Sequence, residues 1–356
     1  MRVNQLLPTL WIEDAIGEEV VALKKLLRSW GLEAEIFAER WHPALAGQAR
    51  AYSECRADHE TVSIYHYSCA HAAMSQLFLD MPGKKVLLYH NITPHQFFAG
   101  INPGFYELTK NGRASLGMFR DRVDLALGDS AYNCAELAAL GYRQPRVLPI
   151  LLDLQKFADT PPCPWTRQPF EDGWTNFLFV GRFVPNKRQE DVVRAFAHYN
   201  RYVDRHSRLF LVGKWMGLDN YLARLRQVIR SLEVEEQVFL TGEVTFPQLL
   251  AYYKMAHVFL CMSEHEGFCV PLVEAMFNDV PVLAYAAAAV PDTLGRAGVQ
   301  VHEKDFPIIA EWAALLTGDD EFRRRVVAGQ RARAQDFRPE IVGGRLRTYL
   351  SEVMAA

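Results

Sequence analysis

The chain has 356 residues, of which 50% are hydrophobic and 23% are charged. This length suits two hydrophobic cores better than one, and the composition is that of a folded globular protein rather than a disordered or fibrous one. The formal net charge is −3, and neither half of the chain is strongly basic. Nucleic acid is therefore disfavoured as a partner.

Short apolar runs alternate with amphipathic stretches along the first half. The pattern predicts strands at residues 3–6, 34–37, 61–65, 85–89, 125–128 and 146–149, with helices at 15–30 and 133–140. Alternation of this kind predicts an α/β fold with a parallel sheet covered by helices on both faces.

Residues 159–175 hold four prolines and show no clear period, so they are the best candidate for a linker. The alternation then restarts. It predicts strands at 177–180, 209–212, 238–241, 258–262 and 281–285, and helices at 189–201, 221–232, 246–255, 271–278, 308–316, 320–335 and 339–354.

The sequence thus predicts two Rossmann-like, doubly wound domains, at residues 1–160 and 161–338. We expect the final helix, within 339–356, to pack back on the first domain. Ligands on such sheets bind outside the carboxyl ends of the strands, so two facing crevices would form one cleft.

The six cysteines form no CxxC pair and no His/Cys metal-binding spacing, which predicts buried thiols in a reducing compartment and no metal site. The N-terminus does not resemble a signal peptide, and no apolar run approaches membrane-spanning length. We expect a cytoplasmic protein, with peripheral contact at the inner face of the membrane left open.

The most informative segment is SEHEGFCVPLVEAM, residues 263–276. It follows an apolar strand, and Pro271 suits the first turn of the next helix. The backbone amides of 267–270 are then free donors at a helix N-terminus, where an anion binds readily. Glu266 and Glu274 can each accept two hydrogen bonds from a sugar or ribose diol. The simpler reading, that both acids favour the helix dipole, explains less of this combination.

A second segment, FLFVGRFVPNK at residues 177–187, places Gly181 at the end of a strand and Arg182 and Lys187 before a helix. Arginine offers phosphate a planar fork and lysine a point charge. Such cations stabilise the charge that grows on a departing diphosphate. Solvated surface charge is the alternative.

His90 follows the strand KVLLY and precedes Asn91. A polar pair at the carboxyl end of a strand would face the predicted cleft. A structural role remains an equal alternative on position alone.

The pairing of VGRFVPNK with EHEGFCVPLVEAM resembles the retaining GT-B glycosyltransferases of the family-four type. DAIGEEVVAL, YHNITP, GDSAYNCAELAALGY and FLTGEV resemble further motifs of that family over almost the whole chain. The resemblance implies that Glu274 holds the donor ribose and Glu266 the hydroxyls of the transferred sugar. The diphosphate would then lie against Arg182 and Lys187.

The same resemblance assigns His90 to the reaction centre and Gly17 to the donor phosphate or sugar. Together with those named above, the implied donor-binding residues are Gly17, Gly181, Gly242, Gly267, Phe268, Cys269 and Val270. The chain departs from the family at Asp279, where glycine is usual, and at Asp292, which replaces glutamate. We expect the change at Asp279 to be structural, at a left-handed helix C-cap.

The implied function is transfer of a hexose-type sugar, with retention, from a UDP- or GDP-sugar to a glycan or lipid-linked acceptor, as in polysaccharide biosynthesis. No Asp-x-Asp, GxGxxG or P-loop motif is present, which predicts a metal-independent enzyme with no cofactor beyond its donor. A nucleotide-sugar epimerase, a phosphorylase or a catalytically silent subunit that binds nucleotide sugar remain alternatives.

The basic stretch 110–122, with Leu116, Met118 and Phe119, either rests on an anionic membrane or is a solvated helix. The sequence does not specify an oligomeric state.

Overall fold

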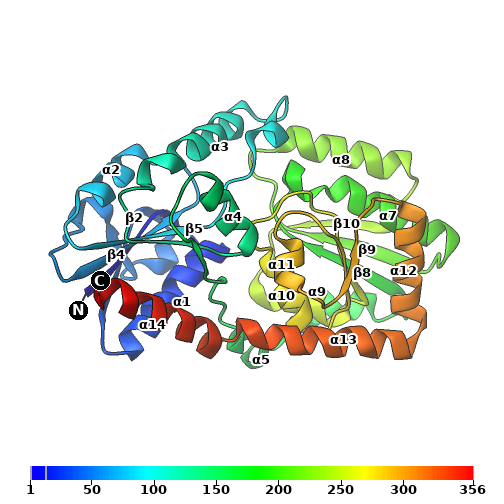
Figure 1. Cartoon of the computed structure of the whole chain (residues 1–356). Helices are drawn as coiled ribbons and strands as arrows, with labels where there is room; N and C mark the ends of the chain where they lie inside the picture. The colour runs from blue at the N-terminus through cyan, green and yellow to red at the C-terminus, as the bar shows by residue number, and fades with distance from the viewer. Residues whose placement is uncertain (1, 13, 356) are drawn as a thin grey trace. The chain divides into compact units, whose positions relative to one another are not determined.

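The computed structural model describes residues 2–12 and 14–355. The chain divides into two compact units. The first comprises Met1–Gln96, Gly104–Asp153 and Asp336–Ala356, and the second comprises Phe97–Pro103 and Leu154–Gln335. Each unit contains one parallel sheet with helices packed against it, as Figure 1 shows. The predicted fold of two Rossmann-like domains is confirmed.

The sheet of the first unit has the strand order β3-β2-β1-β4-β5-β6-β7. Its strands are β1 (Arg2–Leu10), β2 (Glu33–Trp41), β3 (Ala49–Ala51), β4 (Thr61–Tyr67), β5 (Lys84–Tyr89), β6 (Leu125–Gly128) and β7 (Arg146–Val147). The main helices are α1 (Ala15–Ser29), α2 (Ala72–Asp80), α3 (Pro103–Ser115), α4 (Ala131–Ala139) and α14 (Pro339–Ala355).

Successive residues of β4 and β5 supply two different cores. Ile64 and Leu88 belong to one buried cluster, while Tyr65 and Tyr89 belong to another. Side chains alternate across a strand, so the sheet is apolar on both faces, as a parallel sheet between two layers of helices must be. This is why these strands read as nearly continuous apolar runs in the sequence.

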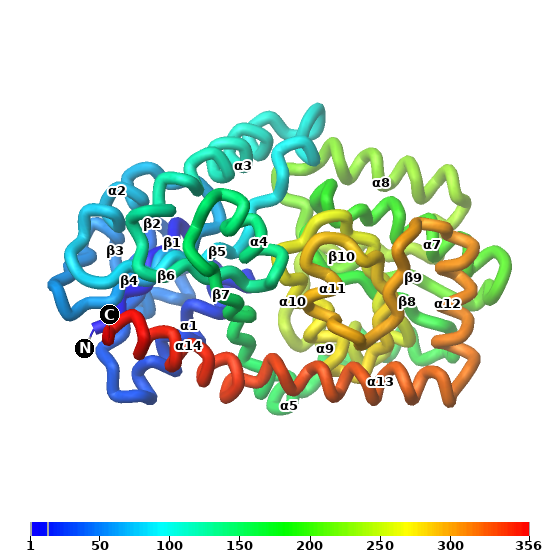
Figure 2. The backbone as a smooth tube through the Cα atoms, in the orientation of Figure 1, coloured from blue at the N-terminus to red at the C-terminus, as the bar shows by residue number. Residues whose placement is uncertain are grey.

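The final helix α14 is part of the first unit. Val342, Leu346 and Leu350 share a buried cluster with Val3 of β1 and Leu27 of α1. The backbone tube shows α14 lying alongside α1 (Figure 2). The chain therefore returns to its first unit after completing the second.

The sheet of the second unit has the order β10-β9-β8-β11-β12-β13. Its strands are β8 (Thr175–Val180), β9 (Ser207–Val212), β10 (Val238–Gly242), β11 (Val258–Cys261), β12 (Val282–Tyr285) and β13 (Val299–Val301). Its helices are α5 (Gln155–Asp159), α6 (Pro164–Arg167), α7 (Gln189–Tyr202), α8 (Asp219–Ser231), α9 (Phe246–Met255), α10 (Val270–Phe277), α11 (Val290–Leu294), α12 (Phe306–Gly318) and α13 (Asp320–Ala334).

The interpretation of residues 159–175 as a linker is wrong. Pro164 begins the short helix α6, where a missing N–H is tolerated. Phe170 packs edge-on against Phe210 and Phe239, with ring centroids 4.8 Å and 5.4 Å apart. The Cys163 amide donates to the Pro247 carbonyl at 2.9 Å. Pro164 and Pro169 lie in the short helices Pro164–Arg167 and Gln168–Phe170, which belong to the second unit.

The units change over at Asp153/Leu154 and at Gln335/Asp336, so their limits differ from the expected 160/161 and 338/339. Residues 97–103 also group with the second unit. The Asn102 amide donates to the Gly217 carbonyl at 2.6 Å, and the Phe97 ring packs near that of His265 at 6.2 Å. These contacts explain why residues 97–103 group with the second unit, which the sequence pattern does not predict.

Candidate donor site and a buried histidine network

Two motifs that lie about 80 residues apart in the sequence meet at the carboxyl ends of the neighbouring strands β8 and β11. The Glu264 amide donates to the Asn186 carbonyl at 2.8 Å, and the Asn186 side-chain amide donates to the His265 carbonyl, also at 2.8 Å. These reciprocal bonds fix the loop after β8 against the loop after β11. The residues that resemble a diphosphate site and a sugar site are therefore neighbours.

Lys187 and Glu266 form the centre of this arrangement. The Lys187 amine lies 2.7 Å from Glu266 Oε1, and the Ser263 hydroxyl donates to the same oxygen at 2.8 Å. Although burial disfavours the charged amine, the Glu266 carboxylate raises the pKa of Lys187 above its usual value. Gly181 makes room for this lysine, because an added Cβ would lie 3.1 Å from Lys187 Cδ. Arg182 is exposed beside it.

Glu274 lies inside α10, the helix that follows the loop of Glu266. The Tyr253 hydroxyl donates to Glu274 Oε2 at 2.7 Å, and burial together with this carboxylate raises the pKa of Tyr253. The hydrogen bond holds the carboxylate in one orientation. Glu274 and Glu266 thus have separate partners within the same strand–loop–helix segment.

The start of α10, where the sequence predicts an anion site, has a sharply turned backbone. Cys269 is the N-cap residue, and Pro271 occupies the first turn. Phe268 is buried and Gly267 is half-buried. The Cys269 backbone is left-handed, with φ 70°, which turns the chain sharply into Val270 at the first helical position.

Gly242 and Asp279 also occupy left-handed backbone positions. Gly242 ends β10 with φ 74°, and an added Cβ would lie 3.3 Å from the Trp215 ring. Asp279 follows α10 with φ 61°, and its carboxylate accepts two 2.7 Å hydrogen bonds from the Arg331 guanidinium. The position is the left-handed C-cap expected from the sequence, and the Asp279 carboxylate is bound by Arg331.

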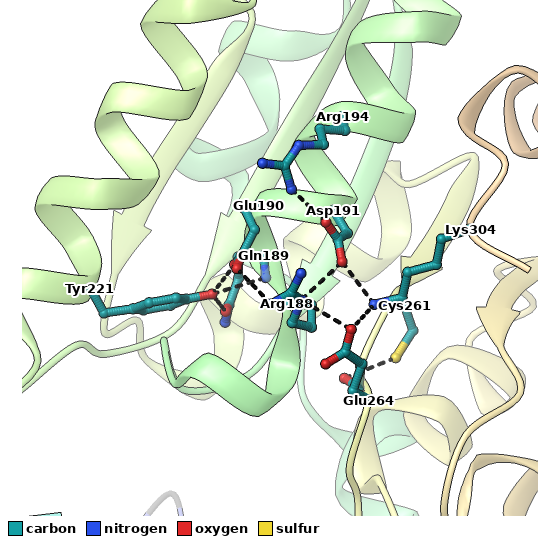
Figure 3. Close-up of polar contacts among 10 residues, drawn as sticks. Arg188, Gln189, Glu190, Asp191, Arg194, Tyr221, Cys261, Glu264 and Lys304 are labelled. Carbon is teal, nitrogen blue, oxygen red and sulfur yellow. Dashed lines mark hydrogen bonds and ion pairs between the residues drawn. The ribbon is translucent and has the colours of Figure 1, made fainter. Parts of the chain in front are cut away.

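A cluster of charged residues, which the sequence did not suggest, includes Glu264 in the loop after β11 (Figure 3). Arg188 Nε lies 3.0 Å from Asp191 Oδ2 and 3.3 Å from Glu264 Oε1. Lys304 Nζ contacts the same two carboxylates at 2.7 Å and 2.8 Å. Although burial opposes it, the hydrogen bonds from Lys304 and Arg188 lower the pKa of Asp191. Two cations and two anions thus fasten α7 to the loop that carries Glu266.

In the first unit, His90 lies in a buried chain of polar side chains. Its Nε2 is 2.9 Å from His66 Nδ1, and its Nδ1 is 3.1 Å from Asp129 Oδ2. His66 Nε2 is in turn 3.0 Å from Gln5 Oε1. Glu19 Oε2 lies 3.6 Å from His90 Nδ1. The His90 side chain is 1% exposed.

The hydrogen-bond pattern fixes the protons in this chain. Gln5 donates its amide N–H to the Val20 carbonyl at 3.1 Å, so its oxygen faces His66 and must accept. His66 Nε2 therefore carries a proton, and a neutral His66 presents Nδ1 as an acceptor. His90 then donates from both nitrogens, to His66 and to Asp129, and is an imidazolium.

The pKa shifts of the two histidines agree with a neutral His66 and a charged His90. Burial, followed by the charge of His90, lowers the pKa of His66 well below its usual value. For His90 burial opposes the charge, but Asp129 and Glu19 outweigh it and raise the pKa to about 9. Burial raises the pKa of Glu19 and of Asp129. Both nitrogens of His90 are thus engaged inside the first unit, which favours the structural role over direct contact of its ring with a ligand.

Gly17 lies near the start of α1, where Asp14 caps the helix by accepting from the Gly17 amide at 3.3 Å. A Cβ at this position would lie 2.3 Å from the Trp11 carbonyl oxygen. The close passage of the preceding backbone therefore requires a glycine here, whether or not a ligand also approaches it.

The basic stretch 110–122 offers little to a membrane. Leu116 and Phe119 are core residues, and only Met118 of the three named apolar side chains is exposed. Arg113 and Arg120 are paired with Glu136 and Asp121. This favours the solvated-helix alternative. Within residues 2–12 and 14–355, no helix combines the length and apolar character needed to cross a bilayer.

Solved structures with the same fold define the class. The chain is similar to Anabaena Alr3699/HepE in complex with UDP-glucose, with a TM-score of 0.77 and 15% identity over 99% of this chain and 100% of the other. It is equally similar to the sucrose-phosphate synthase of Thermosynechococcus elongatus, with a TM-score of 0.77 and 16% identity over 100% and 99%. The fold is that of the GT-B class.

The sequence of the second unit also resembles a known family. Residues 167–333 match the family model described as "Glycosyl transferases group 1". Among curated relatives, the N-acetyl-alpha-D-glucosaminyl L-malate synthase of Bacillus anthracis is 31% identical over 183 residues, 50% of this chain and 45% of that protein. The O-antigen chain mannosyltransferase B of Escherichia coli is 26% identical over 171 residues, 48% and 44%. The matched region spans less than half the length of either relative.

Proposed function

We propose that the protein is a retaining glycosyltransferase that moves a hexose-type sugar from a UDP- or GDP-sugar to a glycan or lipid-linked acceptor. The observation that carries the proposal is the Lys187–Glu266–Ser263 triplet. It places a cation and an oriented carboxylate at adjacent strand ends, beside the start of α10. The group 1 match of residues 167–333 and the names of the relatives support the same activity.

In this proposal the diphosphate of the donor binds Arg182 and Lys187. Lysine carries three N–H donors, so its amine can contact a phosphate oxygen while it keeps its bond to Glu266. As the bond from sugar to phosphate breaks, the negative charge on the leaving oxygen grows, and a preplaced cation stabilises it more than it stabilises the bound donor. The N-terminal end of the α10 helix dipole adds to this effect.

Glu266 has two tasks in the same proposal. It holds Lys187 in place, and its remaining lone pairs accept hydrogen bonds from hydroxyl groups of the transferred sugar. Its carboxylate also favours the positive charge that develops on the sugar ring. Glu274, held by Tyr253, binds the ribose diol, which does not change during the reaction. The leaving diphosphate itself assists a front-face attack, so the configuration is retained without a protein nucleophile.

The proposed acceptor class rests on the relatives. One is described as an O-antigen chain mannosyltransferase, which supports a role in polysaccharide biosynthesis. We keep the cytoplasmic location, with or without contact at the inner face of the membrane, as part of the proposal.

The test is a thermal-shift screen of the full chain with UDP, GDP, ADP and their sugars. A ligand at 100 times its dissociation constant stabilises the folded state by roughly 2.7 kcal/mol. The donor identified in this way is then incubated with and without a panel of glycan acceptors. Transfer with retained configuration supports the proposal. Conversion of the donor without acceptor indicates an epimerase, and binding without turnover over the whole panel indicates a silent subunit.

A further inference from the structure

Two of the six cysteines face each other beside Glu266. Cys261 ends β11 and Cys269 is the N-cap residue of α10. Their Sγ atoms and a carboxylate oxygen of Glu266 all lie within 4.8 Å of one another. Cys261 Sγ also lies 3.4 Å from the Ser263 hydroxyl, which itself donates to Glu266. The thiol pair is therefore built into the same loop as the candidate sugar site.

The backbone at Cys269 makes a cysteine there a costly choice. Its φ of 70° is left-handed, a conformation that glycine adopts freely and other residues rarely do. Strained positions of this kind persist where the side chain has a use. At this position the side chain is the Cys269 thiol, which lies against the Cys261 thiol.

We propose that Cys261 and Cys269 are a redox-sensitive pair that closes into a disulfide under peroxide and thereby turns off the donor site around Glu266. The proposal rests on the function proposed above for its consequence, but the disulfide itself does not depend on that function.

The chemistry balances with a peroxide as oxidant. The Cys261 thiolate attacks one peroxide oxygen, which gives a sulfenic acid and releases hydroxide that leaves as water. The Cys269 sulfur then attacks the Cys261 sulfur and displaces its hydroxyl group, which leaves as water with the proton of the Cys269 thiol. Two thiols and one hydrogen peroxide thus give one disulfide and two waters. The hydrogen bond from Cys269 lowers the pKa of Cys261, which matches its role as the attacking thiolate. The same hydrogen bond and burial raise the pKa of Cys269.

A metal ion is the less suitable occupant of this cluster. The Glu266 carboxylate already holds the ammonium of Lys187 at 2.7 Å, and a second cation would have to displace the first. A disulfide is neutral and needs no such exchange. It does require the sulfurs to approach to about 2.05 Å, which draws the start of α10 towards the end of β11 and shifts the residues between them, Glu266 included.

The experiment maps the bond first. The reduced full-length chain is exposed to hydrogen peroxide, free thiols are alkylated in denaturant, and the protein is digested with a protease that cleaves after glutamate. Glu264 and Glu266 both lie between the two cysteines, so a disulfide holds two otherwise separate peptides together. We expect that linked pair, its loss after dithiothreitol, and a fall of the thiol count from six to four.

The second arm measures UDP and GDP binding by thermal shift for the reduced and oxidised chain. We expect oxidation to weaken binding of the preferred nucleotide at least about tenfold. The disulfide moves the start of α10, which carries the proposed diphosphate and ribose contacts, and the loss of one hydrogen bond to a charged group is enough for a change of about tenfold. Each variant is compared only with its own reduced form. Cys261→Ala should lose the peroxide effect, whereas Cys134→Ala, which removes a buried thiol of the first unit, should keep it.

Absence of the linked peptides overturns the proposal, and so does a linked pair that leaves nucleotide affinity unchanged. If the reduced chain binds neither nucleotide, the proposed function has failed, and the peptide map alone then decides whether the thiol pair exists.

Discussion

The charge of His90 should make the stability of the first unit fall as pH rises above neutrality. The pKa of His90 is raised from 6.5 to about 9. A difference of about 2.5 pH units, at 1.36 kcal/mol per unit, corresponds to about 3 kcal/mol of stabilisation by the charged form. Because this pKa is higher in the folded state, the stabilisation is complete below about pH 6.5 and is lost as pH rises to about 9.

The groups that face His90 act in the same direction or outside this window. The pKa values of Glu19 and Asp129 are raised by burial, so these carboxyls also hold protons better in the folded chain, and their contribution too falls as pH rises. The pKa of His66 is lowered, so His66 opposes folding only below its unfolded value near 6.5. From pH 6.5 to 9 the network therefore only loses stability.

The matched perturbation is Asp129→Asn, which keeps the shape of the side chain and removes its charge. At pH 6.5 we expect this variant to lose part of that stabilisation, because Asp129 supplies the largest of several favourable interactions with the charged His90. The melting temperature should fall by about 2–4 °C for each kcal/mol lost, for a domain of this size. The gap to the parent should narrow steadily towards pH 9. Melting curves at half-unit steps of pH measure this. A gap that stays constant over the whole range would refute the assignment of an imidazolium. Nitrogen chemical shifts of the two imidazoles provide the direct check.

The remaining predictions concern the two candidate sites. Glu274→Ala should weaken binding of the free nucleotide diphosphate, because hydrogen bonds to a charged acceptor are each worth about 1.5–3 kcal/mol. Glu266→Ala should mainly lower kcat. Calorimetry and kinetics on both variants separate the two roles, and an equal loss of nucleotide affinity in both would contradict them. Transfer should survive EDTA, and loss that Mg²⁺ or Mn²⁺ restores would show the opposite. Gly17→Ala should destabilise by about 1–3 kcal/mol, because its Cβ would meet the Trp11 carbonyl oxygen at 2.3 Å; an unchanged melting temperature would show that the backbone yields. Cys269→Gly should stabilise the reduced chain by about 1 kcal/mol by relieving a left-handed backbone; a lower melting temperature would mean that the thiol contributes more than the strain costs.

The order of the main elements could be predicted because both sheets are parallel and buried on both faces. Such strands are apolar runs, and the helices between them keep a 3.6-residue period. The short edge strands β3 and β13 gave too few residues for a pattern. Residues 159–175 give the pattern of a linker because proline is common in irregular chain, but Pro164 begins a helix. The packing of Phe170 on the sheet is a tertiary contact that no local signal carries.

The part of the site that could be predicted is the part where chemistry and local structure coincide. Lys187 and Glu266 each follow an apolar strand, and parallel strands end at the same edge of a sheet. The ion cluster of Arg188, Asp191 and Lys304 has no signal in the sequence, because charged residues at helix starts and in loops are common. Only the fold shows which of them meet.

His90 illustrates the limit most sharply, because its position was predicted and its environment was not. A histidine at the end of a strand reads as a group facing solvent or ligand. What decides its state is three residues from three other strands or their ends: Gln5 in β1, His66 in β4 and Asp129 after β6. The Gln5 carbonyl forces a proton onto one side of His66, and His66 then accepts the proton of His90, whose second proton Asp129 holds. Each link depends on a neighbour brought in by the sheet order, so the charge on His90 is a property of the fold. A histidine that is charged and bonded at both nitrogens stiffens the strand ends on which it lies.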